Sequence, residues 1–228
     1  MAYCPSSSIY KLYRIMKLDI SYIESELKKR CNLPYVWNRK QNDTWDDATK
    51  FIYKTMSWEA LLAQIEEQQK EHNFPTQDFF NYAINRWYNF WSAQAVEKIF
   101  TDLPGFAPNP NPVEDHYDFR WLGERIDHKT SIFPKGFGEN YAFAKAHKTQ
   151  LIHWFYKHQS TGQRFHLNNR LFIVVHDQNG EHWKLKAEIE LIKSIIEPYG
   201  KQKTPAVMEV LSLEEGKETM ADIIWVNR

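Results

Sequence analysis

A short turn between two strand-like segments is the feature that most limits how this chain can fold. The segment from His116 to Ser131 alternates apolar and polar residues on both sides of Leu122-Gly123-Glu124-Arg125. Glycine at the first central position is what the positive φ of a type II′ turn requires. The sequence therefore predicts a β-hairpin whose turn spans residues 122 to 125.

Counting outward from that turn predicts which residues face each other. Arg120 is expected opposite Asp127, and Asp118 is expected opposite Lys129. Because side chains alternate along a strand, these charged residues should share one face. The other face should carry Phe119, Trp121, Ile126 and His128. A slip of one residue would put the charged face in the core, so the register is expected to be well specified.

Two carboxylates and an ammonium on one face have two interpretations. Asp118, Asp127 and Lys129 could form a site for a metal ion and a phosphate. They could also form a ladder of salt bridges, in which each surface pair contributes roughly 0–1 kcal/mol. The hairpin alone favours the ladder, and the rest of the chain shifts the balance toward the site.

An Asp, eight residues and then Asp-x-Lys on the partner strand resembles the signature of the PD-(D/E)xK nuclease superfamily, which includes many restriction enzymes and DNA-repair nucleases. That superfamily places a helix with a Glu before the first strand, and an α-helix and a buried strand after the Lys. The order helix, strand, strand, helix, strand is expected here across residues 76 to 177. Pro112 and Val113 depart from the signature, because they do not directly precede Asp118.

The resemblance implies a function, a cofactor and site residues. It implies a metal-dependent phosphodiesterase or endonuclease that acts on DNA in restriction or repair, with Mg²⁺ or Mn²⁺ as the cofactor. The catalytic residues would be Asp118, Asp127 and Lys129. The metal ligands would be Asp118, Asp127, Glu97 and the backbone carbonyl of His128. The candidate substrate contacts are Gln163, Arg164 and Lys135.

Two other functions remain open at this stage. Arg120, expected opposite Asp127, could occupy the place of a metal ion, and the chain would then be a non-catalytic nucleic-acid-binding or regulatory protein that keeps the nuclease scaffold. A weaker alternative is an interaction protein that uses its many surface aromatic residues. Glu97 also has a second interpretation, as a solvated acid on a helix surface.

Composition indicates an ordinary globular chain with 43% hydrophobic and 25% charged residues. No apolar run approaches the roughly 20 residues that span a bilayer, and the N-terminus lacks the pattern of a signal peptide. We therefore expect a cytoplasmic protein with no membrane partner. Its two cysteines are too few for a disulfide framework.

The charge is unevenly distributed although the formal net charge is zero. Between Arg125 and Arg170 there are eight Lys or Arg residues against Asp127 and Glu139, a local balance of 8 − 2 = +6. A basic segment of this kind favours contact with a polyanion such as DNA. Nuclease relatives of this kind are commonly homodimers, although no residue marks a dimer face.

Periodicity and turn residues predict two regions. Residues 1–75 are expected to form a helical region packed on the core, with helices over 20–31 and 45–71. Residues 76–228 are expected to form a restriction-endonuclease-like core of the α/β (α+β) class, a central mixed β-sheet flanked by helices. Helices are expected over 77–101 and 140–158, with a third that ends near 198–200. Strands are expected over 171–175, 205–211 and 220–226, the last two extending the sheet edge, and residues 106–112 should be a loop.

Overall fold

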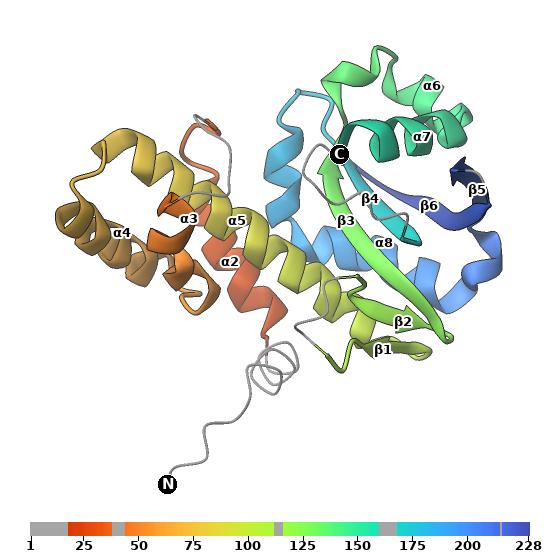
Figure 1. Ribbon diagram of the computed structural model, residues 1–228, viewed down its shortest axis with the longest axis horizontal. Coiled ribbons are helices and arrows are strands. Elements are labelled where there is room, and N and C mark those ends of the chain that lie inside the picture. Colours follow the sequence, from red (N-terminus) through yellow and green to blue (C-terminus); the bar gives the residue numbers. More distant parts are fainter. Residues whose placement is uncertain (1–17, 38–43, 112–115, 160–167, 215) are drawn as a thin grey trace, which may run out of the picture.

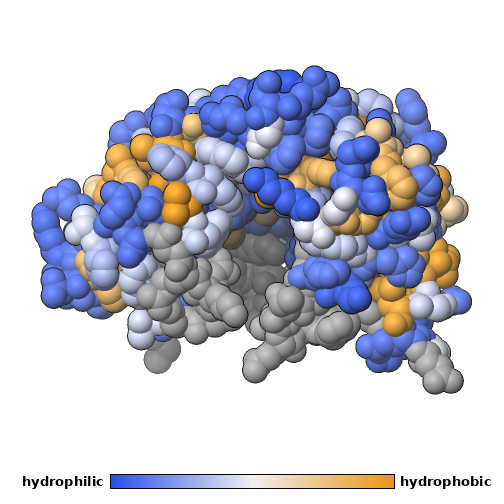
Figure 2. Space-filling view, turned by 90° about the horizontal axis from the view of Figure 1, so that it is seen from above, coloured by the Kyte–Doolittle hydropathy of each residue, from blue (hydrophilic) through white to orange (hydrophobic). Residues whose placement is uncertain are grey.

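The protein is described by a computed structural model that covers residues 18–37, 44–111, 116–159, 168–214 and 216–228. A mixed six-stranded sheet with helices on both faces forms one end of the molecule, and helices alone form the other (Figure 1). The predicted α/β class is therefore confirmed. A hollow lies on one side between the two ends (Figure 2). None of the helices within the described ranges combines the length and apolar character of a membrane span.

The sheet runs in the order β1-β2-β3-β4-β6-β5. Strands β3, β4 and β6 are parallel neighbours, and the other pairs are antiparallel. The strands are β1 (Phe106–Pro108), β2 (Phe119–Trp121), β3 (Glu124–Ile132), β4 (Arg170–His176), β5 (Glu209–Glu214) and β6 (Lys217–Asn227). The predicted strand over 171–175 is confirmed as β4, which is buried on both faces, as a central parallel strand should be.

Two predictions about the strands are wrong. The segment expected to be a loop from residue 106 begins with β1, because Phe106 stacks on Trp121 with ring centroids 5.3 Å apart. Pro108 is tolerated there because β1 is an edge strand. Strands β6 and β5 extend the sheet beyond β4, as predicted, with β5 at the edge. The predicted strand from residue 205 also begins late, since Pro205–Val207 forms the 3₁₀ turn η4.

The helical end contains α2 (Ile20–Arg30), α3 (Thr44–Ala48), the 3₁₀ turn η1 (Lys50–Tyr53) and α4 (Trp58–His72). The predicted helix over 20–31 is confirmed, and the Asp19 carboxylate caps it by accepting from the backbone N–H of Tyr22. The continuous helix predicted over 45–71 is wrong. It is interrupted because the carbonyl of Thr55 accepts indole N–H groups from Trp87 and Trp91, and Ser57 then caps α4.

Three long helices cover the sheet. Helix α5 (Thr76–Thr101) confirms the helix predicted over 77–101, and with α8 (Ile189–Gln202) it covers one face. Helix α8 ends later than expected, and Gly200 lets it approach β1, because a β-carbon there would lie 2.7 Å from Leu103 Cδ1 and 3.2 Å from Cε2 of Phe106 on β1. The helix predicted over 140–158 is split at His147 into α6 (Tyr141–Ala146) and α7 (Lys148–Gln159), and α7 covers the other face. Two further 3₁₀ turns are η2 (Lys135–Phe137) and η3 (His182–Ala187).

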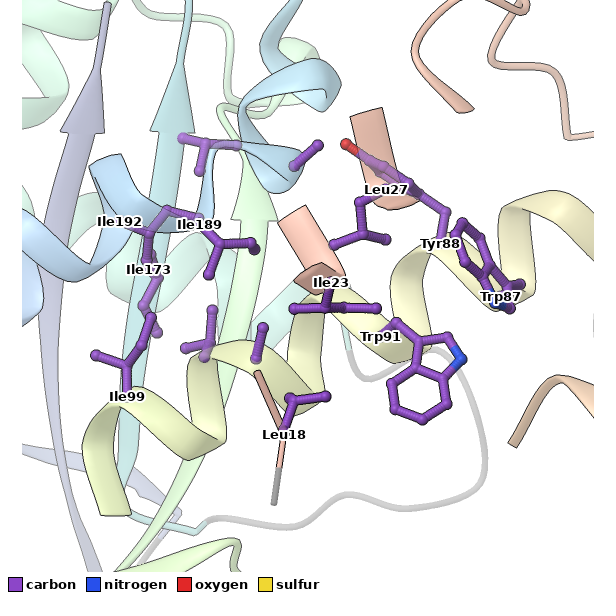
Figure 3. Packing of buried hydrophobic residues seen from close by; sticks show 14 of the residues in the cluster. Leu18, Ile23, Leu27, Trp87, Tyr88, Trp91, Ile99, Ile173, Ile189 and Ile192 are labelled. Carbon is purple, nitrogen blue, oxygen red and sulfur yellow. The ribbon is translucent and has the colours of Figure 1, made fainter. Parts of the chain in front are cut away.

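The two faces of β4 belong to different clusters of buried side chains. Leu171, Ile173 and Val175 pack toward α5 and α8. Phe172 and Val174 pack toward α7. The first cluster continues into the helical end, where Ile23 and Leu27 of α2 lie with α5, as Figure 3 shows. The orientation of each residue on β3 can therefore be read from its partner on β4.

The hairpin between β2 and β3 differs from its predicted form. The pairs are Phe119 with Ile126, Arg120 with Arg125, and Trp121 with Glu124. The two central turn residues are Leu122 (φ 49°) and Gly123 (φ 99°), so the turn is type I′ and not type II′. The predicted pairs Arg120–Asp127 and Asp118–Lys129 are consequently wrong. The turn moves because Leu122 N–H donates to the Gly105 carbonyl at 2.7 Å, which aligns Trp121 with Phe106.

The predicted apolar face of the hairpin is nevertheless confirmed. Moving the turn by one residue shifts the cross-strand pairing by two, and a shift of two leaves each side chain on its original face. The buried residues are Phe119, Trp121, Ile126 and His128.

Candidate active site

A polar pocket lies beside β3, next to α5. Strand β2 pairs only with residues 124–126 of β3, so the following part of β3 faces α5 without a strand on that side. The pocket has a volume of about 300 Å³. It is lined by Asn89, Ser92, Ala93, Gln94 and Glu97 of α5, by Asp118, by His128, Lys129 and Thr130 of β3, and by Lys186 of η3.

Helix α5 brings Glu97 into this pocket. Asn89, Ala93 and Glu97 are spaced by four residues, so they lie on one side of the helix. Glu97 is only 2% exposed, and its Oε2 accepts from the Gln94 amide at 3.0 Å. The interpretation of Glu97 as a solvated acid on a helix surface is therefore wrong, and Glu97 lines the same pocket as Asp118 and His128.

Asp118 and His128 form a buried pair at the pocket wall. The Asp118 Oδ2 atom accepts from the backbone N–H of His128 at 2.8 Å and lies 2.7 Å from its Nδ1. The Nε2 atom of the same ring lies 3.2 Å from the carbonyl of Ala93 on α5. With an acceptor at each ring nitrogen, His128 is held as an imidazolium that ties β2, β3 and α5 together.

Burial and charge oppose each other in this pair. Burial acts to raise the pKa of Asp118, but the charge of His128 and its hydrogen bonds outweigh burial and hold that pKa well below its usual value. Burial acts to lower the pKa of His128, but the Asp118 carboxylate outweighs it and raises that pKa. Each residue therefore favours the charged form of the other, and their hydrogen bonds fix the orientation of the Asp118 carboxylate.

The Asp118–His128 pair should make stability depend on pH. The lowered pKa of Asp118 stabilises the fold above about pH 4, its unfolded value, and this is lost as pH falls through the folded pKa. The raised pKa of His128 stabilises below about pH 6.5 and is lost as pH rises through its folded pKa. Urea unfolding at pH 5.5 should show His128→Gln less stable than wild type by about 2 kcal/mol, with a smaller gap at alkaline pH.

The control for this prediction is His153→Gln, which changes an exposed histidine on α7 and should leave the pH profile as it is. A stability gap for His128→Gln that stays constant between pH 5.5 and alkaline pH would contradict the charged pair.

Asp127 and Lys129 lie on the other face of the sheet. Asp127 pairs with Arg170 across β3 and β4, and Lys129 pairs with Phe172, which packs against α7. Arg170 Nε donates to Asp127 Oδ2 at 2.8 Å, and Lys129 Nζ lies 3.0 Å from Asp127 Oδ1. The Arg170 guanidinium also lies 5.1 Å from the ring centroid of Tyr156 on α7. Asp127 is therefore a buried carboxylate with a basic partner at each oxygen.

The prediction that Asp118, Asp127 and Lys129 point the same way is wrong. The Asp118 backbone N–H donates to the Ile126 carbonyl on β3, but its carboxylate turns to the backbone N–H and Nδ1 of His128. Asp127 is held by β4 instead. Lys129 borders the pocket through its place on β3, but its ammonium is at Asp127.

Arg120 does not take the place of a metal ion either. It faces Arg125, donates to the carbonyl of Gly123 at 3.0 Å, and lies 5.3 Å from the ring centroid of Tyr117. The residue that neutralises Asp127 is Arg170, which the sequence marked only as part of a basic segment. Lys186 was also missed, because neither a motif nor a periodic pattern distinguishes it from its neighbours.

The predicted substrate contacts are not brought together in the described structure. Gln163 and Arg164 lie outside the described residues, as do Pro112 and Val113. Lys135 is exposed in η2 and is absent from the pocket lining. Its predicted role in binding substrate therefore has no support from the pocket.

Three of the four predicted metal ligands border the pocket. Asp127 N–H donates toward Asn169, whereas His128 N–H donates to Asp118. Because N–H and C=O of one strand residue point the same way, the His128 carbonyl lies on the Asp118 side. The oxygen groups on the pocket wall therefore include two carboxylates, from Glu97 and Asp118, and oxygen is the ligand type that Mg²⁺ prefers. Within the described ranges, no group of three or more His, Cys, Asp or Glu side chains could hold a metal ion.

Comparison with known proteins gives no matching family model, no matching curated protein and no matching solved structure. Of the predicted site residues, Glu97, Asp118 and Lys129 line the pocket, whereas Asp127 is not among its lining residues and pairs with Arg170 on the other face of the sheet.

Proposed function

We propose that this protein is a metal-dependent phosphodiesterase that cleaves a nucleic-acid backbone, as restriction and DNA-repair nucleases do. The observation that carries the proposal is the pocket beside β3, where the buried Glu97 and Asp118 line one cavity with the backbone of His128. The succession α5, β2, β3, α7 and β4 adds support, because it is the order of elements that the PD-(D/E)xK resemblance implies.

The residues of the pocket would divide the work as follows. Glu97, Asp118 and the His128 carbonyl would hold Mg²⁺ or Mn²⁺, which when bound supplies an activated water and neutralises charge on the phosphate. The His128 imidazolium keeps Asp118 ionised and fixes the direction of its carboxylate. The Gln94 amide orients Glu97 in the same way. Asp127 and Lys129 form a structural network on the other face and take no part in the proposed chemistry.

The test is cleavage of DNA and RNA oligonucleotides by the purified protein with Mg²⁺ or Mn²⁺. We expect cleavage that EDTA stops, and a rate at least about 10²-fold lower in Glu97→Gln and in Asp118→Asn. Glu66→Gln is the matched control, because Glu66 is an exposed acid on α4 paired with Lys70. Cleavage that is equal in wild type and Glu97→Gln would reject the assignment.

A second candidate is a non-catalytic protein that binds nucleic acid on the same scaffold. The observation that favours it is that both acids of the signature have basic partners, Asp118 with His128 and Asp127 with Arg170. Calorimetry separates the two candidates. Binding of Mn²⁺ that Asp118→Asn abolishes supports the enzyme. DNA binding with steep salt dependence and without metal binding supports the scaffold protein.

A further inference from the structure

The pocket has a second end that the proposed chemistry leaves unused. Lys186 of η3 lines it, and its Nζ donates to Asn89 Oδ1 at 3.1 Å. Asn89 precedes Glu97 by eight residues on α5, which corresponds to about 12 Å along the helix axis. The pocket therefore has an acidic end at Glu97 and Asp118 and a cationic end at Lys186.

Lys186 differs from the other lysines near it. Lys184 pairs with Glu181, and Lys28 pairs with Glu188, whereas Lys186 makes no ion pair with any acid in the described ranges. Burial lowers its pKa to about 8. A half-buried ammonium without an anion is costly, because it has lost part of its water and its hydrogen bond in the described structure is to a neutral acceptor. An anionic ligand in the pocket would remove that cost.

The other groups at this end do not compete for such an anion. Asn89 and Ser92 of α5 and Thr130 of β3 are neutral and polar. The carboxylates of the pocket lie at its other end, where the proposed metal ion would neutralise them. A strand that enters the pocket would thus meet a cation at each end, the metal ion and Lys186.

We infer that Lys186 binds a second phosphate of the substrate strand, a few nucleotides from the phosphate that is cleaved. This inference rests on the proposed function. It also names the substrate class, which is a nucleic-acid strand rather than an isolated phosphodiester. Lysine suits this role because its ammonium binds phosphate as a point charge. The distance from Glu97 makes Lys186 a substrate-binding residue, separate from the reacting atoms.

The first test measures binding without cleavage. The full chain is titrated with a fluorescent single-stranded DNA oligonucleotide in EDTA, and fluorescence anisotropy gives Kd. We expect Lys186→Gln to raise Kd about tenfold. The slope of log Kd against the logarithm of the salt concentration should fall by about one, because one phosphate contact is lost. Lys186→Arg, which keeps the charge, should stay close to wild type. The control Lys193→Gln changes an exposed lysine on α8 paired with Glu190 and should also stay close to wild type.

The second test separates the strand from a single phosphodiester. With Mg²⁺ or Mn²⁺, Lys186→Gln should raise KM for the oligonucleotide about tenfold and leave hydrolysis of bis(p-nitrophenyl) phosphate as in wild type. An equal loss on both substrates, or unchanged oligonucleotide binding in Lys186→Gln, would overturn the inference. If wild type binds the oligonucleotide through Lys186 but cleaves neither substrate, the proposed function fails and the binding site stands.

Discussion

Replacing Arg170 with methionine should lower the free energy of unfolding by about 3–5 kcal/mol. Arg170 and Asp127 have side chains only 8% and 7% exposed, and their hydrogen bond is 2.8 Å long. Without the guanidinium, Asp127 would stay buried with Lys129 as its only basic partner among the described residues, and that lysine is 48% exposed. Urea unfolding followed by tryptophan fluorescence measures the change.

Two comparisons make this prediction specific. The double variant Asp127→Leu/Arg170→Met should recover much of the loss, because no buried charge is left without a partner. Lys201→Met breaks the exposed pair with Glu197 on α8 and should cost less than about 1 kcal/mol. If Arg170→Met costs no more than Lys201→Met, the buried pair does not stabilise the fold.

Asp127 also distinguishes structural from catalytic roles. We expect Asp127→Asn to destabilise the protein and to leave metal binding intact at temperatures where the variant is folded, because Asp127 lies on the α7 face. Loss of Mn²⁺ binding with unchanged stability would instead return Asp127 to the metal site that the sequence predicts.

Replacing Trp87 with alanine should lower the free energy of unfolding by about 3–5 kcal/mol. Trp87 is fully buried on α5 (Figure 3). Its indole N–H donates to the Thr55 carbonyl at 2.7 Å, and its ring centroid lies 5.6 Å from that of Trp58. It therefore joins α5 to α4 and to the segment before α4. Thermal unfolding monitored by circular dichroism measures the effect, and Trp87→Phe, which keeps most of the apolar volume, should cost much less.

The same experiment tests the predicted division at residue 75. Leu61 and Ile65 of α4 belong to one buried cluster with Trp87 and with Ile173 of the sheet. A shared core should unfold in one cooperative transition, so Trp87→Ala should shift that whole transition. Two separate transitions, with only one displaced by Trp87→Ala, would show that residues before 76 fold independently.

Local patterns were enough to predict several elements. Helix α5 carries apolar residues in helical register and starts beside Pro75, and α2 starts at the capping residue Asp19. Strand β4 is an apolar run closed by a turn at Gly180. These signals depend on residues close together in the sequence, so folding of the rest of the chain does not alter them.

The errors arise where distant segments determine local structure. The β2–β3 turn moved by one residue because Leu122 bonds to Gly105 and Trp121 aligns with Phe106, both on a segment expected to be a loop. The helix over 45–71 is broken because indoles from α5 take the Thr55 carbonyl. No pattern within either segment reports these partners.

The candidate site also contains some residues that the sequence selected and others that only tertiary contacts placed. The resemblance to the nuclease signature selected Glu97 and Asp118, and strand alternation was sufficient to place His128 on the buried face, because that face depends on one pair of adjacent strands. The pairing of β3 with β4 turned Asp127 to Arg170, and the packing of η3 on α5 brought Lys186 to the pocket. Arg170 is 43 positions from Asp127 in the chain, and Lys186 is 97 positions from Asn89. Side chains so far apart in the sequence can be matched by charge only after the sheet and the helices have packed.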